Sequence, residues 1–152
     1  MGSSRRVLAR ALIMVVATGA MFVPALATPA VAAAKSCKSH ASAFDQYVNQ
    51  TGSATNYITC NFTAYQIHVK ATLWWSRHSS GPWTQLAVAS GDCFGVVAGI
   101  RCAVTTALVS HPDPCAGNVW LQARGTGWGK VFGGSQISTP VDKDTIPAGC
   151  LA

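Results

Sequence analysis

One stretch of the chain alternates strictly between apolar and polar side chains. In YQIHVKATLWW, residues 65–75, the odd-numbered positions are Tyr, Ile, Val, Ala, Leu and Trp, and the even-numbered positions are Gln, His, Lys, Thr and Trp. Successive side chains of a β-strand point to opposite faces, so this period predicts a strand with one buried and one wet face. Trp75 is then expected in the core, and Trp74 on the polar face beside Thr72 and Lys70.

Further short strands are expected at 57–62, 83–90, 101–110, 118–124 and, after a Gly-rich turn, around 131–137. Within 118–124 the alternation places Val119, Leu121 and Ala123 inward and Trp120, Gln122 and Arg124 outward. Turns containing Gly or Pro separate these segments, and helix signals are few. The predicted fold class is therefore all-β, a small antiparallel β-sandwich of about six to seven strands, with a small β-barrel as the alternative.

The segment before these strands lacks their alternation. Residues 35–56 are expected to form a peripheral N-terminal arm, either an extended segment pinned by Cys37 or a short helix. The helix would place three apolar side chains on one face, at Phe44, Tyr47 and Val48. The sandwich domain is then predicted over residues 57–152, with no internal repeat and no second domain.

The first 34 residues read as a secretory signal peptide that is removed after Ala34. Arg5, Arg6 and Arg10 precede a long apolar stretch that ends in small residues, which is the order that signal peptidases require. The chain is therefore expected to be secreted and extracellular. Once this segment is removed, no span of the membrane is expected in the mature form.

All six cysteines lie in the predicted mature chain, at Cys37, Cys60, Cys93, Cys102, Cys115 and Cys150. An even number in an exported chain predicts three disulfides. Only one pair is favoured locally, because Cys93 and Cys102 flank a short loop with two glycines and are expected to clip one hairpin. No CxxC spacing occurs among the six cysteines, so a metal site is not expected.

The composition argues against several classes of function. Residues 35–152 hold eight Lys or Arg, five Asp and no Glu, a net charge of +3 without a cluster, so nucleic acid is not expected as a partner. No catalytic or nucleotide-binding motif is present, and the four His stand at no ligand spacing. Asp142 and Asp144 read as a solvated turn in an irregular tail that Cys150 ties down. We therefore expect no enzyme activity and no cofactor.

The outward tryptophans suggest a binding surface. If their strands share a sheet, Trp74 and Trp120 are expected to form an aromatic patch near Arg124, His68 and Lys70. Trp and Arg are favoured at interfaces, and exposed Trp is uncommon unless something covers it. The alternative is that a loop or the N-terminal arm of the same chain covers Trp74.

Five short motifs between Cys60 and Gly127 carry a resemblance: VKATLWW, GPW, ASGDC, CAV and CAGNVWLQARGTG. Through them this segment resembles a group of small secreted actinobacterial β-sandwich proteins. Some proteins of this profile are similar to the adaptor subunit of actinobacterial umbrella toxin particles, in which a small protein links a large repeat-bearing subunit to a lectin-bearing one. The resemblance implies the fold and an adaptor role, and it implies no site residues.

Three hypotheses about function follow. The first is a secreted, non-enzymatic binding module, with a protein partner, that serves as an adaptor in an extracellular or toxin assembly. The second is an antimicrobial toxin or inhibitor that acts alone. The third is a carbohydrate-binding protein in which Trp74 or Trp120 stacks on a polysaccharide.

Overall fold

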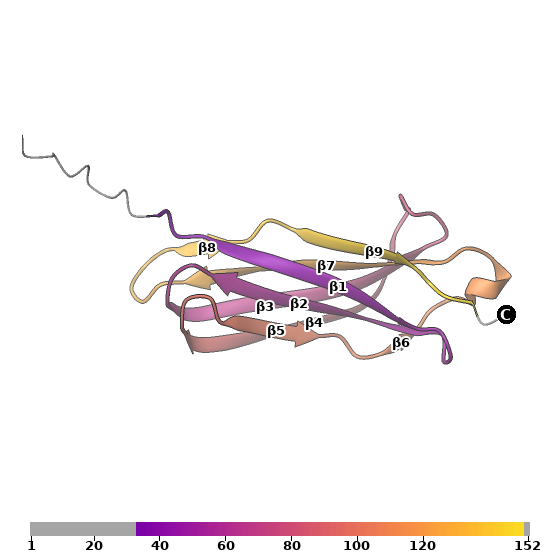
Figure 1. Cartoon of the computed structure of the whole chain (residues 1–152), viewed down its shortest axis with the longest axis horizontal. Helices are drawn as coiled ribbons and strands as arrows, with labels where there is room; N and C mark the ends of the chain where they lie inside the picture. The colour runs from indigo at the N-terminus through magenta and orange to yellow at the C-terminus, as the bar shows by residue number, and fades with distance from the viewer. Residues whose placement is uncertain (1–32, 151–152) are drawn as a thin grey trace, which may run out of the picture. The chain divides into compact units, whose positions relative to one another are not determined.

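In the computed structural model, which describes residues 33–150, nine strands form two antiparallel sheets that pack face to face (Figure 1). Sheet A consists of β1 (Cys37–Gln46), β2 (Thr51–Cys60), β5 (Arg101–Thr105) and β6 (Val109–Ser110). Sheet B consists of β3 (Ala64–Ser76), β4 (Thr84–Val96), β7 (Trp120–Lys130), β8 (Gln136–Ser138) and β9 (Asp142–Pro147). A short 3-10 turn, η1 (Pro114–Ala116), precedes β7. The predicted sandwich is confirmed, with nine strands where about six to seven were predicted, and the sheets do not close into the alternative barrel.

The core lies between β2 of sheet A and the two central strands of sheet B, β3 and β7. Its largest fully buried apolar side chains are Ile58, Ile67, Val69, Leu73 and Leu121. Burial of one such side chain stabilises the fold by about 1.5–3 kcal/mol relative to exposure. The predicted alternation is confirmed from Ile67 to Leu73 and again in β7, whereas Tyr65 is half exposed because it lies at the open end of the sandwich.

The prediction of a peripheral arm over residues 35–56 is wrong. This segment forms β1 and half of β2, which pair along ten registered positions and make up much of sheet A. Neither the short helix nor an unpaired extended segment is present. The inward positions of β1 are Cys37, Ser39, Ala41 and Ala43. These side chains are small, so a pattern of large apolar residues does not detect the strand.

The Gly-rich segment predicted as a turn is instead the second half of β7. Gly125, Gly127 and Gly129 face inward, where the two sheets approach closely. A Cβ at Gly129 would lie 2.6 Å from both sulfurs of the Cys37–Cys60 disulfide. Real Cβ atoms do not approach that closely, so glycine is what allows sheet A to pack on β7.

The predicted irregular tail is also wrong, because β9 pairs with β7 from Gly125 to Trp120. Asp142 and Asp144 do not lie in a solvated turn. Their carboxylates accept hydrogen bonds from the backbone N–H groups of Ala41 and Ala43, each at 2.8 Å. These groups belong to β1 at the edge of sheet A. The two carboxylates therefore satisfy an open strand edge and join the sheets along one side.

Three disulfides connect all six cysteines: Cys37–Cys60, Cys93–Cys102 and Cys115–Cys150. The predicted pair Cys93–Cys102 is confirmed, but it does not clip a hairpin. Cys93 lies on β4 of sheet B and Cys102 on β5 of sheet A, so the bond ties the sheets together on the side opposite β1 and β9.

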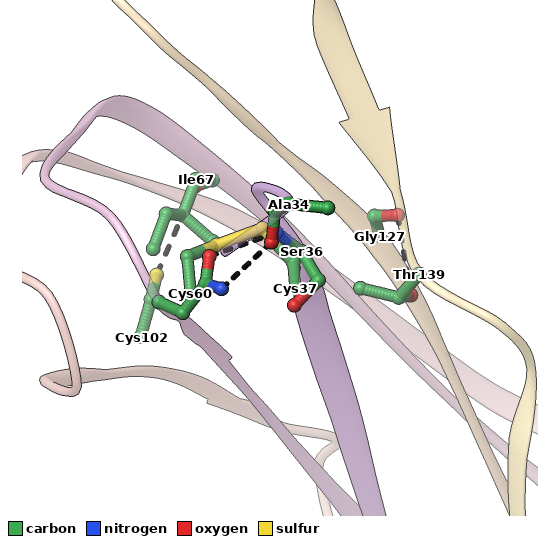
Figure 2. The surroundings of a disulfide bond; sticks show 9 residues. Ala34, Ser36, Cys37, Cys60, Ile67, Cys102, Gly127 and Thr139 are labelled. Carbon is green, nitrogen blue, oxygen red and sulfur yellow. Dashed lines mark hydrogen bonds between the residues drawn. A yellow bond between two sulfur atoms is a disulfide. The ribbon is translucent and has the colours of Figure 1, made fainter. Parts of the chain in front are cut away.

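Cys102 also packs beside the first disulfide (Figure 2). Its Sγ lies 3.8 Å from the carbonyl oxygen of Ile67. Because this sulfur is already bonded to Cys93 and carries no hydrogen, the approach is a packing contact. Two disulfides therefore brace the same end of the core.

The predicted signal peptide, residues 1–34, lies outside the described residues except for its last two positions. Within residues 33–150, no helix has the length and apolar character needed to cross a membrane.

Candidate functional site

The outer face of sheet B brings together four of the five residues predicted for binding. His68, Lys70 and Trp74 project from β3 on the side away from the core, and Arg124 projects from the neighbouring strand β7. The register pairs Thr72 with Arg124, which places Arg124 between Lys70 and Trp74 across the strands. Strand β9 adds Lys143 directly opposite Arg124.

A shallow depression of about 380 Å³ lies on this face, and we name it the basic hollow. It is lined by Lys70, Thr72, Trp74, Arg124, Thr126, Val141 and Lys143. Three strands and the segment before β9 therefore contribute to one surface. Three of its seven lining residues are cations, and none is an acid.

Arg124 is held in a fixed orientation within the hollow. Its guanidinium lies over the ring of Trp74, 4.5 Å from the ring centroid, and its Nε donates to Gln122 Oε1 at 2.6 Å. Gln122 is almost fully buried and donates in turn to Thr145 Oγ1 at 2.9 Å. Stacking and a hydrogen bond to Nε leave the two terminal amino groups of Arg124 as the available donors.

The cations of the hollow have no acidic partner in the described part of the chain. Both ion pairs found within residues 33–150 involve histidine, and neither includes Lys70, Arg124 or Lys143. The two carboxylates of β9 face the other way, toward the backbone of β1. Strand β9 thus presents Lys143 to the outer face while its negative charges are taken up inside, which leaves the hollow positively charged.

Trp74 has a hydrogen-bond donor without an acceptor in the described part of the chain. Its indole Nε1 is buried and has no hydrogen-bond acceptor within residues 33–150. A buried N–H without a partner costs about 1–3 kcal/mol. Trp74 therefore carries a buried donor that the described part of the chain does not satisfy.

His68 lies farther along β3 and is already engaged. Its ring stacks on Trp128 of β7, with the centroids 5.5 Å apart, and its Nδ1 lies 3.0 Å from Asp92 Oδ1. Asp92 also accepts a hydrogen bond from Gln66 at 3.1 Å. The hydrogen bond from His68, followed by that from Gln66, holds the pKa of the Asp92 carboxyl below its usual value. His68 therefore borders the hollow and does not line it.

Trp120 does not join the predicted aromatic patch. It pairs with Ser76 at the far end of β3 and lines a separate recess with Pro114, Asn118 and Pro147. Within residues 33–150 no ring contact joins Trp120 to Trp74, and the residue directly opposite Trp74 on β7 is Gln122. The patch predicted from two tryptophans is therefore a Trp–Arg pair.

The two adjacent tryptophans of β3 point to opposite faces, as predicted. Trp75 is partly buried and packs against the core cluster that contains Leu73 and Leu121. Trp74 is also partly buried, and Arg124 is what covers its ring. The alternative in which residues 35–56 cover Trp74 is wrong, because those residues form sheet A on the inner side of sheet B.

Several residues of this outer face were not predicted from the sequence, chiefly Lys143 and Trp128. Both lie in segments predicted as turn or tail. A signal was available in each, because GTGWGK and VDKD alternate with a period of two, which is the period of a strand.

Within residues 33–150, no group of three or more His, Cys, Asp or Glu side chains is placed to hold a metal ion. No protein-family model matches the sequence, and no curated protein is significantly similar to it. The resemblance of residues 60–127 to small secreted actinobacterial proteins therefore stays a prediction.

Proposed function

We propose that this protein is a secreted, non-enzymatic binding module that holds an acidic segment of a protein partner in the basic hollow. The observation that carries the proposal is Arg124, stacked on Trp74 and fixed through Nε, with its terminal amino groups free and two unpaired lysines beside it. A planar guanidinium in this arrangement matches the geometry of a carboxylate.

The chemistry of the surface favours a protein over a polysaccharide. A sugar ring stacks on an open aromatic face, but Arg124 covers the ring of Trp74 and His68 covers the ring of Trp128. Arg and Trp are, in contrast, the residues that most often dominate the energetics of protein interfaces. Lys70 and Lys143 would steer an acidic partner toward the hollow.

The three disulfides support an extracellular location, because such bonds persist in oxidising compartments. Together with the predicted signal peptide they favour a module that works after export. The specific form of the proposal is an adaptor role, in which the module joins two or more partner chains in one extracellular assembly.

Co-purification from the culture medium of the producing organism tests the proposal. The tagged protein is recovered with its bound chains, which are identified and quantified by mass spectrometry. We expect a stable partner protein, and we expect Lys70→Glu/Lys143→Glu to recover at least about tenfold less of it, because two attractive contacts with an acidic segment become repulsive. Two or more partner chains in one complex would support the adaptor role.

The matched control is Lys38→Glu/Lys130→Glu, which makes the same change of charge at two exposed lysines outside the hollow. It should retain the partner. Equal loss with both double variants would mean that net charge alone governs binding, and equal retention would place the interface elsewhere. A protein that stays alone in the medium would count against the binding module and favour a molecule that acts by itself.

A further inference from the structure

One end of the sandwich gathers three connections between strands. These are residues 61–63 between β2 and β3, 97–100 between β4 and β5, and 131–135 between β7 and β8. They lie side by side at the left of Figure 1, where β1 begins. We name this region the loop end. It is separate from the basic hollow, which lies along the middle of sheet B.

Large apolar side chains project into solvent at the loop end. The most exposed are Phe132 at 82%, Phe94 at 65%, Val97 at 61% and Ile100 at 59%. Soluble proteins scatter such residues singly, whereas a cluster marks a surface that contacts something apolar. The loop end therefore has the composition of a docking surface.

Phe94 lies near the end of β4, and the loops that carry Val97, Ile100 and Phe132 are ordered turns. Ile100 N–H donates to Val97 C=O at 3.1 Å, and Gly134 N–H donates to Val131 C=O at 3.0 Å. Gly99 N–H also donates to the carbonyl of Cys60 at 2.9 Å. Because Cys60 is bonded to Cys37 (Figure 2), the loop after β4 is tied to a cross-linked strand pair. The apolar side chains are thus held outward by a rigid base.

The aromatic side chains do not form a flat platform. Tyr65 contacts Phe94 and Phe132 edge to face, with interplanar angles of 73° and 77°. A sugar ring needs one open, flat aromatic face, which this arrangement does not offer. Protruding rings at different angles instead suit insertion into a soft apolar phase.

Charge at the loop end has one sign. Four of the eight Lys and Arg residues within 33–150 lie at its strand ends or just before them, all of them exposed: Lys35, Lys38, Arg101 and Lys130. None of the five Asp residues of that range lies in the three loops or at these strand ends. The carboxylate on β4 closest to the loop end is that of Asp92, and it forms hydrogen bonds with His68 and Gln66.

From this combination we infer that the loop end docks on the surface of an anionic phospholipid bilayer. Val97, Ile100 and Phe132 enter the boundary between headgroups and acyl chains. The surrounding Lys and Arg side chains reach anionic headgroups, and their aliphatic stems lie along the apolar region. Each basic side chain near an anionic membrane surface adds about 1 kcal/mol to binding, which is roughly a fivefold gain.

A second copy of the chain is a poorer occupant of the same surface. Two loop ends brought together would place four cations of one copy against the same four cations of the other. No carboxylate at these strand ends would offset that repulsion within residues 33–150. The one-signed charge therefore selects an anionic surface.

Flotation with lipid vesicles tests the inference on the exported protein. The protein should float with vesicles of phosphatidylcholine mixed with an equal amount of phosphatidylglycerol, and not with phosphatidylcholine alone. Val97→Ser/Phe132→Ser should lower partitioning at least about tenfold, because two inserted apolar side chains are lost. Lys130→Glu/Arg101→Glu should lower it by a similar factor, and added salt should weaken the binding of the unchanged protein.

Two controls separate this surface from the rest of the molecule. Val48→Ser removes an apolar side chain of similar exposure, 63%, from the turn between β1 and β2, and Arg77→Glu reverses an exposed charge just after β3, at the opposite end of that strand from the loop end. Both should float like the unchanged protein. Absence of flotation with the anionic vesicles, or equal loss with the controls, overturns the inference. A dimer in size-exclusion chromatography that Val97→Ser/Phe132→Ser dissociates, without vesicle binding, would assign the surface to self-association instead.

Discussion

The inner and outer faces of β3 and β7 belong to the same backbone but have opposite properties. Inward, Ile67, Val69 and Leu73 are fully buried, and glycines of β7 let sheet A approach closely. Outward, the same two strands carry Lys70, Trp74 and Arg124 around an open depression. Because side chains alternate along a strand, neighbouring residues can contribute separately to the core and to an exposed surface.

The two faces also differ in how completely their polar groups are satisfied. Asn56 of sheet A is fully buried, accepts from Ser39 Oγ at 2.8 Å, and donates to the carbonyls of Lys70 and Thr126 at 3.0 and 3.2 Å. Every donor of its side chain amide has a partner. On the outer face, Trp74 Nε1 has none within the described residues. The closed inner network therefore fixes how the two sheets pack.

The largest effect is expected from a branched side chain at the glycine face. Gly129→Val should prevent folding or cost more than about 4 kcal/mol, because its Cβ would overlap the Cys37–Cys60 sulfurs. Circular dichroism and thiol titration measure the outcome. Thr126→Val, outward on the same strand, should change the free energy of unfolding by no more than about 0.5 kcal/mol. A stable Gly129→Val protein would contradict the close packing of the sheets.

Loss of the inner polar network should come next. Asn56→Ala leaves two buried carbonyls and the Ser39 hydroxyl without their partner, which should lower the free energy of unfolding by about 3 kcal/mol. Urea denaturation measures it. Ser39→Ala removes only one bond of the network and should cost about 1 kcal/mol. Equal effects of both substitutions would mean that Asn56 does not join the two sheets.

Substitution of each of the two adjacent tryptophans compares how much the inner and the outer face contribute to stability. Trp75→Ala should cost about 2–3 kcal/mol, because its partly buried ring packs against the Leu73 cluster. Trp74→Ala should cost less than about 1.5 kcal/mol and should weaken partner binding instead. Urea melts of both proteins decide the comparison. Equal destabilisation would make Trp74 a packing residue and remove its role in recognition.

The sequence predicted those strands whose inward side chains are large and apolar, and it missed those whose inward side chains are small or acidic. From Ile67 to Leu73 large apolar residues mark the buried face, so both the strand and the opposite orientations of the tryptophans were predictable. Strand β1 buries Cys, Ser and Ala, and the second half of β7 buries glycine, so neither segment shows a pattern of large apolar residues. In β9 two of the three inward residues are Asp142 and Asp144, which pattern reasoning assigns to solvent.

Half of the candidate site could be found for the same reason. Lys70, Trp74 and Arg124 lie on strands with a clear alternation, but Lys143 depends on β9. That strand docks because its carboxylates meet N–H groups of Ala41 and Ala43, 101 residues away in sequence. A partner so distant is set by the tertiary fold, so the period of two in VDKD can indicate a strand but not where that strand docks.

The smallest effect on stability is expected from Asp92, which lies on β4 at the edge of sheet B. The pKa of Asp92 is lowered by its hydrogen bonds to His68 and Gln66. Its contribution to stability is therefore present above the ordinary value of 3.8 and is lost as the pH falls through the lower folded value. Urea melts of the unchanged protein and Asp92→Asn should differ slightly at neutral pH and converge in acid. A difference that grows in acid would contradict the assignment.

The most direct test of the outer face as a recognition surface measures stability and affinity together in Arg124→Ala. Its matched control is Arg101→Ala, since Arg101 also stacks on an aromatic ring, that of Tyr57 at 4.4 Å, but on sheet A. Affinity for the partner protein recovered from the medium should fall at least about 30-fold with Arg124→Ala, and unfolding should change by less than about 1 kcal/mol. Arg101→Ala should bind that partner normally. Unchanged affinity of Arg124→Ala, or an equal loss with Arg101→Ala, would contradict the basic hollow as the binding site.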